Sequence, residues 1–327
     1  MRAIRQHAFG GPEELWLEEV PDPHPGEGQV RIRVESAGVH LIDTVIRRGQ
    51  PGGPYPLPSL PMTPGREVAG RIDETGPGVD PRMTGRLAVA DLGPASGGYA
   101  EQAVASATSV HLLPDGLSAD DAVAMIGTGR TAIHILEVAA PGAEDVALVT
   151  AAGGGIGTLL IQALRTTGAT VIGLAGSGPK SSLACELGAV TAVNYSQPGW
   201  AEKVGVALGG RPATLVLDGV GGEVGRTAMS LLGPGGRLVL FGSASGSVTQ
   251  LSATDLFSHG ITATAAIGAR LMGRPGGLRP LETKALQAAA EHRLVPVIGQ
   301  RFPLADAVGA HKAVESRATT GKTILYP

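Results

Sequence analysis

With 327 residues the chain is about twice the usual domain size of roughly 150 residues, so two domains are expected. Hydrophobic residues make up 43% and charged residues 17%, a composition that excludes an intrinsically disordered chain. The formal net charge of -3 and the scattered Lys and Arg residues offer no basic surface for nucleic acid, which is therefore not expected as a partner.

The N-terminus and the apolar runs predict a cytoplasmic protein without a membrane partner. Residues 1–20 alternate charged with apolar residues and lack the continuous apolar block of a signal peptide. No apolar run reaches the roughly 18 residues that would cross a bilayer. The single cysteine, Cys185, excludes an intrachain disulfide and a zinc site built from several cysteines. Because it lies among helically spaced apolar residues, Cys185 is expected to be buried.

The first third of the chain is expected to form a β-rich domain. Short alternating runs, such as residues 29–39 and 85–92, are separated by clusters of Gly and Pro, which is typical of strands joined by turns. Pro51 to Gly65 holds too many prolines for a helix or an inner strand, because proline lacks the N–H and restricts the residue before it. We expect this segment to be an ordered loop that forms a wall of a site.

From about Ser118 the sequence shows helical periodicity and then alternates strands with helices. Each expected strand is a short β-rich run, and the six runs are residues 146–151, 169–175, 189–195, 213–220, 236–242 and 261–267. Helical stretches, such as residues 159–166, 180–187 and 223–232, separate most of them. Parallel neighbours need crossovers of this length, so the sequence predicts a Rossmann-type, doubly wound, six-stranded parallel sheet and an α/β fold class. The tail after Ile267 ends in a short strand and is expected to return to the first domain.

A glycine cluster directly follows the first of these strands. The segment AAGGGIG matches A-x-x-G-x-x-G through Ala151, Gly154 and Gly157. Glycines let backbone N–H groups approach a pyrophosphate at the positive end of the following helix. At a strand-to-helix turn that opens a six-strand alternation, the motif predicts a dinucleotide site, with Gly154, Gly155, Ile156 and Gly157 as binding residues.

The end of the second strand distinguishes NAD from NADP. NAD enzymes usually place Asp or Glu about 20 residues past the glycines, where it binds the ribose 2′-hydroxyl. Here the stretch reads LAGSGPK, in which Ser177 offers a hydroxyl and Lys180 a positive charge, and no acid would repel a 2′-phosphate. The sequence therefore favours NADPH.

Motifs over essentially the whole chain resemble those of the medium-chain, zeta-crystallin-like NADPH:quinone oxidoreductases. In chain order they are AGVHLIDTVIRRG, YPLPSLPMTPGREVAG, GGYAE, GTGRTA, AAGGGIGTLLIQ, AGSGPK, VNY, LDGVGG, GGRLVLFG and HKAVESRATTGK. The resemblance implies a GroES-like catalytic domain, residues 1–121 and 268–327. It also implies an inserted Rossmann NADP-binding domain, residues 122–267, with the cofactor in the cleft between the domains.

The same resemblance implies further cofactor contacts. Lys180 and Tyr195 would contact the 2′-phosphate or the adenosine ribose, and Arg317 would reach the cofactor from the C-terminal segment. A tyrosine that packs at a strand end is an equally good interpretation of Tyr195. One side chain and one backbone segment would lie near the nicotinamide end: Thr131, and Phe241, Gly242 and Ser243.

The chain departs from its zinc-dependent relatives at both expected ligand positions. Those relatives have a cysteine after the first AG motif and a histidine in a G-H-E segment, whereas here the segments read AGVHLID and GREVAG. Arg66 cannot be a metal ligand, so catalytic and structural zinc are both expected to be absent. His40 stands where quinone oxidoreductases usually have asparagine.

Without a metal, hydrogen-bond donors have to stabilise the anion formed by the reaction. Quinones and α,β-unsaturated carbonyls suit such a site, because hydride addition leaves an oxygen anion that is delocalised by resonance. The candidate catalytic donors are His40, which can donate a proton near neutral pH, and Tyr55. The competing interpretations are a packed loop histidine and a tyrosine that packs against substrate. Asp43 and Glu67 match family acids and fit a structural role equally well.

We therefore expect NADPH-dependent reduction of a small molecule, a quinone or an enone or enal. Two alternatives remain open: an enoyl-thioester reductase of the same superfamily, and a non-catalytic NADPH-binding or sensor protein. The first would need a larger cleft and a surface for CoA or phosphopantetheine. The edge strand at residues 261–267 is expected to pair with its copy in a homodimer.

Overall fold

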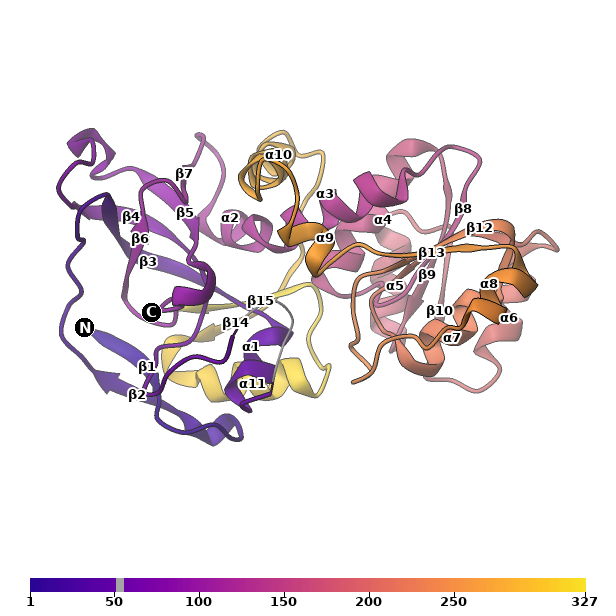
Figure 1. Cartoon of the computed structure of the whole chain (residues 1–327), viewed down its shortest axis with the longest axis horizontal. Coiled ribbons are helices and arrows are strands. Elements are labelled where there is room, and N and C mark those ends of the chain that lie inside the picture. The colour runs from indigo at the N-terminus through magenta and orange to yellow at the C-terminus, as the bar shows by residue number, and fades with distance from the viewer. Residues whose placement is uncertain (51–55) are drawn as a thin grey trace. The chain divides into compact units, whose positions relative to one another are not determined.

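The computed structural model describes residues 1–50 and 56–327, which fall into two compact units. Unit 1 comprises Met1–Arg130 and Glu282–Pro327, and unit 2 is the continuous segment Thr131–Leu281 inserted into it (Figure 1). The two crossings lie within helices α3 (Thr128–Ala139) and α10 (Arg279–Ala290). No helix in the described part of the chain is both long and apolar enough to span a membrane.

A buried ion pair joins the two residues at which unit 1 gives way to unit 2. Arg130 Nη1 donates to Glu282 Oε1 at 2.8 Å, and both residues are largely buried. Asp91 also accepts from Arg130, and His111 Nε2 lies 3.0 Å from Glu282 Oε2. The last residue of unit 1 before unit 2, Arg130, is thus joined by an ion pair to the first residue of unit 1 after it, Glu282.

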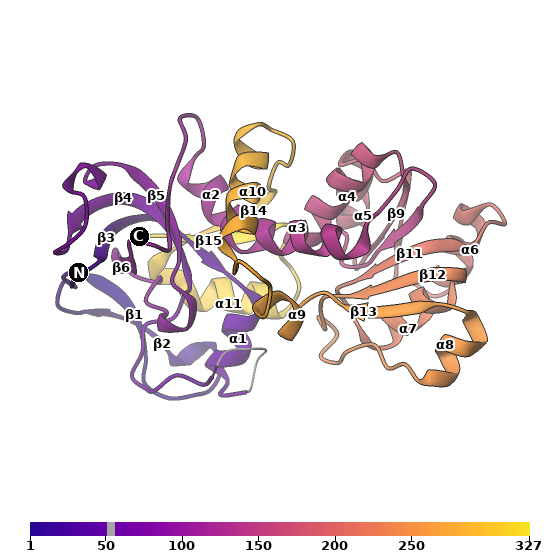
Figure 2. The ribbon, with the colours of Figure 1, turned by 45° about the horizontal axis from the view of Figure 1, so that its top comes forward.

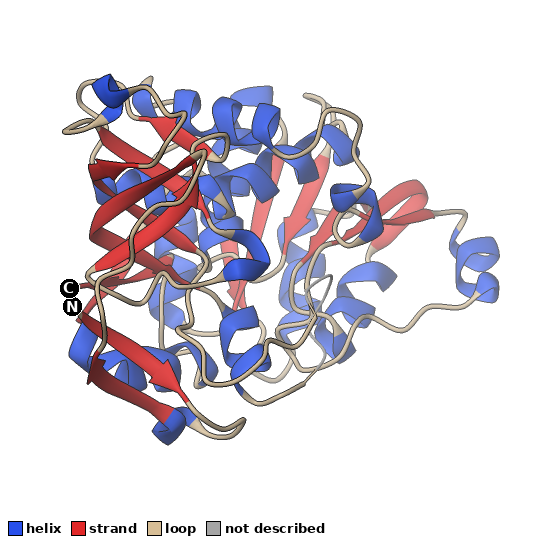
Figure 3. Cartoon of the chain, turned by 60° about the vertical axis from the view of Figure 1, so that its left-hand side comes forward, coloured by secondary structure: helices blue, strands red, loops and turns tan. Residues whose placement is uncertain are grey.

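The core of unit 1 is a seven-stranded sheet in the order β14-β15-β3-β4-β5-β7, in which β6 also pairs with β3. Figure 3 draws the strands of the chain in red. Its strands are β3 (Gln29–Val39), β4 (Glu67–Thr75), β5 (Leu87–Asp91), β6 (Gln102–Ser106), β7 (Val110–Leu112), β14 (Ile298–Pro303) and β15 (Lys322–Tyr326). A separate antiparallel pair is formed by β1 (Arg2–Gln6) and β2 (Leu15–Glu19). Because β15 pairs with β3, the C-terminal strand joins this unit, as the sequence predicts.

The central strand β3 positions the functional side chains of unit 1. Its first part buries alternate residues, whereas residues 36–39 are all buried because this end of the strand runs into the interior. Strands β15 and β4 run antiparallel on its two sides, with Thr323 opposite Val39 and Val68 opposite Ala37. The end of β3 therefore lies beside the beginnings of both β4 and β15.

Three helices complete unit 1: α1 (Leu41–Arg47), α2 (Ala119–Ile126) and α11 (Ala307–Glu315). Short side chains cap two of them, as expected for helix N-termini. Ser118 Oγ accepts the N–H of Asp121 at the start of α2, and Asp306 accepts the N–H of Gly309 at the start of α11. Helix α2 packs on β3, β4 and β5, and helix α11 packs on β14 and β15.

Unit 2 is the doubly wound parallel sheet that the sequence predicts, with strand order β10-β9-β8-β11-β12-β13. Its strands are β8 (Val146–Val149), β9 (Thr170–Ala175), β10 (Thr191–Asn194), β11 (Ala213–Asp218), β12 (Leu232–Leu240) and β13 (Thr262–Ala265). Its helices are α4 (Gly155–Thr167), α5 (Gly178–Glu186), α6 (Trp200–Leu208), α7 (Gly222–Ser230), α8 (Ala253–His259) and α9 (Ala269–Met272). Figure 2 shows α4 and α5 on one side of the sheet and α7 and α8 on the other.

Two expectations about unit 2 are wrong in detail. Strand β12 begins at Leu232 rather than at residue 236, because Leu232 already pairs with Ala213 of β11, ahead of a register shift after which the pairing resumes at Arg237. Cys185 is exposed rather than buried. Ala184 is the buried position of α5, and the next residue lies about 100° further round the helix and faces outward.

Candidate active site

The glycine turn lies between β8 and α4, where the sequence places it. A Cβ at Gly157 would lie 2.3 Å from the carbonyl oxygen of Ala151, so the turn closes only around glycine. Gly154 is the N-cap of α4 and provides no side chain for the N–H groups of the first turn. These N–H groups, at the positive end of a 13-residue helix, fit the pyrophosphate of a dinucleotide.

The residues expected at the adenosine end meet where β9 and β10 end. The Lys180 side chain lies over the glycine turn, since a Cβ at Gly153 would lie 2.7 Å from its Cβ and Cγ. The Tyr195 hydroxyl lies 3.1 Å from the place of a Cβ at Gly176. Ser177 is the N-cap of α5. The segment that follows β9, residues 176–180, thus holds a hydroxyl and a cation and no acid, and the Tyr195 phenol lies beside it at Gly176.

The segment expected near the nicotinamide, residues 241–243, is held by the end of β11. The Asp218 carbonyl accepts the N–H of Phe241 at 2.8 Å, and the Phe241 ring packs so closely on Gly219 that a Cβ there would lie 2.5 Å from it. The Asp218 carboxylate accepts from Thr150 Oγ1 at 2.8 Å and from the N–H of Val220 at 3.0 Å. The buried Asp218 thus holds Thr150, at the end of β8, and Val220, directly after β11, through its carboxylate, and Phe241 through its backbone carbonyl.

The structure leaves the predicted roles of three further residues, Thr131, Arg317 and Tyr55, untested. Thr131 is the first residue of unit 2, and Arg317 follows α11 in unit 1 with a φ of 58°. Their contacts with a cofactor remain predictions. Tyr55 lies outside the described residues.

In unit 1 the side chain of His40 meets two buried charged residues at the ends of three neighbouring strands. His40 directly follows β3, Glu67 begins β4 and Lys322 begins β15. His40 Nε2 lies 2.6 Å from Lys322 Nζ and 2.6 Å from Glu67 Oε2, and Lys322 Nζ donates to Glu67 Oε2 at 2.9 Å. We call these three residues the His40 cluster.

Exposure and charge differ within the His40 cluster. The His40 side chain is 23% exposed, whereas those of Lys322 and Glu67 are 5% and 4% exposed. Burial opposes ionisation of Glu67, but His40 and Lys322 outweigh it and hold the pKa of this carboxyl well below its usual range. The cluster therefore contains a buried carboxylate, and His40 is its member that reaches the surface of unit 1.

Two glycines make room for Glu67. A Cβ at Gly38 would lie 2.6 Å from Glu67 Oε2, and one at Gly127 would lie 1.8 Å from Glu67 Oε1. Thr128 follows the second glycine, and its Oγ1 accepts a long hydrogen bond of 3.5 Å from Lys322. Gly38 of the AG motif and Gly127 of the GTG motif are therefore required for the same reason. A side chain at either position would occupy the space of the Glu67 carboxylate, which binds the Lys322 ammonium.

A second buried network supports His40 from the other side. Asp43 Oδ2 accepts the backbone N–H of His40 at 2.8 Å, and Asp43 Oδ1 accepts from Arg66 at 3.0 Å. Tyr99 donates to Asp43 Oδ2 at 3.2 Å and lies 3.2 Å from Nε2 of His311. Arg66, which the sequence analysis excludes as a metal ligand, is the ion-pair partner of Asp43.

Sequence reasoning gave no role to Lys322 or to the pair Tyr99 and His311. One signal was available for Lys322. It opens an apolar strand, KTILY, and a lysine in such a place is rarely buried unless it is paired. The identity of its partners depends on the strand order, which the local sequence does not contain.

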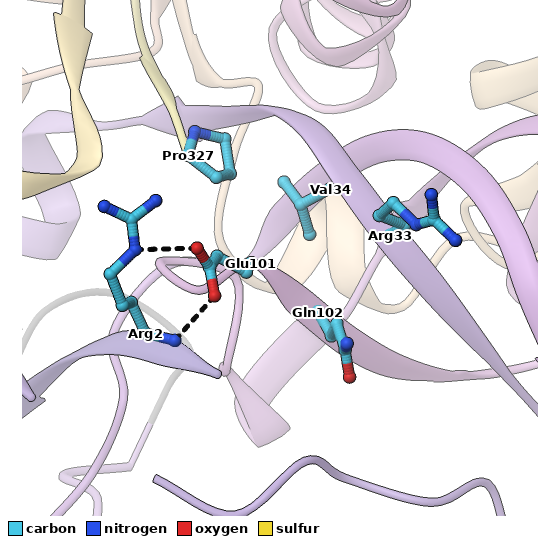
Figure 4. Close-up of a pocket in the computed structure, with 6 residues that line it drawn as sticks. All are labelled: Arg2, Arg33, Val34, Glu101, Gln102 and Pro327. Atoms are coloured by element: carbon cyan, nitrogen blue, oxygen red, sulfur yellow. Dashed lines mark hydrogen bonds and ion pairs between the residues drawn. The ribbon is translucent and has the colours of Figure 1, made fainter. Parts of the chain in front are cut away.

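A hollow of about 320 Å³ on unit 1 holds none of the predicted site residues. It is lined by Arg2, Arg33, Val34, Glu101, Gln102 and Pro327 (Figure 4). Arg2 donates to Glu101 through both its backbone N–H and its Nε, each at 2.7 Å. Because these partners are satisfied by each other, we assign this hollow no part in the active site.

Two family models match the chain, one in each unit. The model described as alcohol dehydrogenase GroES-like domain matches residues 26–115, and the model described as zinc-binding dehydrogenase matches residues 155–279. A quinone oxidoreductase of Salmonella typhimurium is 32% identical, with 99% of each chain covered. The chain belongs to the zinc-independent quinone oxidoreductase family of medium-chain dehydrogenases/reductases.

Other members of the quinone oxidoreductase family agree with this assignment. A 2-haloacrylate reductase of Burkholderia is 31% identical, with 98% of this chain and 97% of the relative covered. The crystal structure of Escherichia coli quinone oxidoreductase complexed with NADPH matches with a TM-score of 0.89 at 30% identity, over 100% of both chains. The predicted resemblance and fold class are confirmed, and the chain is an oxidoreductase.

Proposed function

We propose that the chain is an NADPH-dependent reductase that transfers hydride to a quinone or to an α,β-unsaturated carbonyl. The observation that carries the cofactor assignment is the stretch that follows β9, which holds Ser177 and Lys180 and no acid, with the Tyr195 hydroxyl beside Gly176. The NADPH complex of the Escherichia coli relative supports it. When bound, NADPH supplies the hydride.

The residues of unit 2 bind and orient the cofactor in this proposal. The N–H groups of Gly155, Ile156 and Gly157 hold the pyrophosphate, and Lys180 neutralises the 2′-phosphate. The segment held by Asp218, with Phe241, Gly242 and Ser243, shapes the nicotinamide end together with Thr131. Arg317 contributes from the C-terminal segment.

In unit 1 we propose His40 as the proton donor. It is the partly exposed member of the His40 cluster, so it can reach a substrate while its partners stay buried. Hydride addition to a conjugated acceptor creates an oxygen anion, which a nearby N–H stabilises and then protonates. The 2-haloacrylate reductase among the relatives acts by name on a conjugated acceptor, which supports this substrate class.

Turnover with a panel of acceptors tests the function. Quinones, enals, enones and enoyl thioesters are each mixed with NADPH, and the absorbance of the reduced nicotinamide is followed. We expect consumption with a quinone, an enal or an enone. Consumption with enoyl thioesters alone would identify an enoyl-thioester reductase. NADPH binding without consumption by any acceptor would identify a binding or sensor protein.

The cofactor assignment gives a separate prediction for Lys180→Ala. Loss of a charge-assisted contact of about 1.5–3 kcal/mol should raise the Kd for NADPH by roughly 10- to 100-fold. The Kd for NADH, which lacks the 2′-phosphate, should change less than about twofold because it makes no such contact. Both are measured by titration of nicotinamide fluorescence. Lys203→Ala, an exposed lysine of α6, is the control and should change neither Kd. An equal loss for both cofactors would contradict the assignment.

We also propose that the protein is a cytoplasmic homodimer that pairs through β13. This strand lies at the edge of the unit 2 sheet, and its four residues are exposed or half-buried. An edge strand carries backbone groups that a second copy can pair with. Sedimentation equilibrium should give twice the chain mass, and the mass of a single chain would refute the proposal.

A further inference from the structure

We propose that Asp218 is a positioning residue for the nicotinamide half of the cofactor, and that the adenosine half binds without its help. This inference rests on the proposed use of NADPH. It assigns a function to a buried carboxylate in the LDGVGG segment, which the sequence motifs left without one. Asp218 acts through two backbone turns that it holds together, and not by touching the cofactor.

The Asp218 carboxylate is buried and surrounded by neutral donors. It belongs to the last residue of β11, which is 0% exposed. Oδ1 accepts from Thr150 Oγ1 at 2.8 Å and from the N–H groups of Val220 and Gly221 at 3.0 and 3.1 Å. Oδ2 accepts from Thr249 Oγ1 at 2.5 Å. All four groups donate, which suits an ionised carboxylate, because that group only accepts.

This buried charge is stable only while its donors stay in place. In the described part of the chain no cationic side chain pairs with Asp218, so hydrogen bonds have to compensate its burial. Gly221 is also the N-cap of α7, and the positive end of that helix favours a negative charge. Loss of the donors would leave a buried charge uncompensated, which is strongly unfavourable. The carboxylate therefore keeps the segments that carry its donors together.

Two turns pack on each other around this carboxylate. The first turn is residues 219–221, between β11 and α7, and the second turn is residues 241–249, which follow β12. Ser245 of the second turn donates its N–H to the Val220 carbonyl at 2.8 Å. A Cβ at Gly221 would lie 2.1 Å from a carbonyl oxygen of the second turn. The two turns thus form one body, and the carboxylate binds donors from both.

The place of Asp218 in the sheet assigns it to one half of the cofactor. The strand order of unit 2 reverses between β8 and β11, and a dinucleotide binds across the carboxyl ends of the strands at such a point. Lys180 and Tyr195, proposed for the adenosine end, follow β9 and β10. The two turns follow β11 and β12, on the other side of that point. Opening them should therefore disturb the nicotinamide half alone.

The glycine turn before α4 is held independently of the Asp218 carboxylate. The backbone N–H of Thr150 donates to the Leu217 carbonyl of β11 at 3.0 Å. The backbone N–H of Ala152 donates to the Leu174 carbonyl of β9 at 3.1 Å. These bonds remain when the carboxylate is removed, so the first N–H groups of α4 should still bind phosphate.

Two ligands separate the halves of the cofactor. Adenosine 2′,5′-bisphosphate has the adenosine and the 2′-phosphate of NADPH and lacks the nicotinamide. In Asp218→Ala we expect the Kd for NADPH to rise at least about 10-fold, because the form of the turns that binds the nicotinamide half is populated only part of the time. The Kd for adenosine 2′,5′-bisphosphate should stay within about twofold, which also shows that unit 2 is folded. Isothermal titration calorimetry measures both.

Three further variants complete the comparison. Asp218→Asn keeps an oxygen for the first turn, and its amide NH₂ can donate to Thr249 Oγ1, so it should recover most of the NADPH affinity. Thr249→Val removes only the donor of the second turn and should raise the Kd for NADPH about 3- to 10-fold. Lys180→Ala should show the other pattern and weaken both ligands.

Thr166→Val is the matched control, at an exposed threonine of α4, and should change neither Kd. Equal losses of the two ligands in Asp218→Ala, or an unchanged Kd for NADPH, would overturn the inference. If Asp218→Ala does not fold, the same two outcomes in Thr249→Val decide. An unmodified protein that binds neither ligand would refute the proposed cofactor itself. If the unmodified protein binds NADPH and consumes acceptors while Asp218→Ala weakens both ligands equally, the function stands and this inference fails.

Discussion

Asp43→Ala is expected to lower the free energy of unfolding of unit 1 by about 3–5 kcal/mol, the usual cost of breaking a buried ion pair. The Asp43 side chain is 4% exposed and its partner Arg66 is 7% exposed. Burial opposes the charge of Asp43, but Arg66 and His40 outweigh it and keep the pKa of this carboxyl below its usual value. The substitution also removes the acceptor of Tyr99 and of the His40 backbone. Urea denaturation measures the loss.

Asp80→Ala is the control for this prediction. Asp80 also pairs with an arginine, Arg82, but both side chains are exposed, and exposed ion pairs contribute little to stability. The urea midpoint should therefore stay where it is. If Asp43→Ala shifts the midpoint no more than Asp80→Ala does, the buried network does not stabilise unit 1 in the way its geometry indicates.

Stability is expected to fall as the pH is lowered from 6.5 to 4, and His311 is expected to contribute about 3 kcal/mol of that fall. Burial lowers the pKa of this imidazole to about 4 from 6.5. Arg47 donates to Nδ1 at 3.1 Å, so a proton on that nitrogen would face another donor. The unfolded chain therefore takes up a proton at a higher pH than the folded chain does. The contribution of the neutral His311 ring to the free energy of unfolding is complete above pH 6.5. It declines as the pH falls from 6.5 through about 4.

The measurement compares the pH dependence of unfolding for the protein and for His311→Gln between pH 7.5 and 4. The glutamine variant should show a slope that is smaller by the His311 contribution, whatever its absolute stability. His134, whose pKa is also lowered by burial, stays in both proteins and cancels in the comparison. His24→Gln, at an exposed histidine, should leave the slope unchanged. Equal slopes for the protein and His311→Gln would refute the prediction.

The fold of unit 2 could be predicted because its determinants are local. Most of its strands contain a short apolar run, such as VALV in β8 and TLVL in β11, and helices of predictable length separate most of them. The glycine turn after β8 also follows from its own sequence, since the close approach of Gly157 to Ala151 involves residues six positions apart. The start of β12 could not be predicted, because the Gly-Pro run after Leu232 carries no strand signal and the pairing of Leu232 with Ala213 of β11 is not a local feature.

The candidate site in unit 1 could be predicted only in part, because its contacts are not local. His40 was identified because it differs from the residue usual in the family. The partner Lys322 lies 282 positions away in the sequence, and it meets His40 because β15 pairs with β3. Likewise, no spacing rule places His311 beside Tyr99. Such contacts follow from the order of strands in a sheet that is completed by a returning segment.

The ion pair between Arg130 and Glu282 has a consequence for how such an enzyme can change over evolution. Unit 2 is a single insertion into unit 1, and the unit 1 residues on either side of it, Arg130 and Glu282, form the ion pair. An inserted domain whose two ends lie close together is tolerated well, because the host domain needs little change in its own backbone to accept it. The motif around Lys180, which we propose distinguishes NADPH from NADH, belongs to the insert, whereas the His40 cluster belongs to the host. On this proposal, the residues that choose the cofactor and those that meet the acceptor lie for the most part in different segments of the chain.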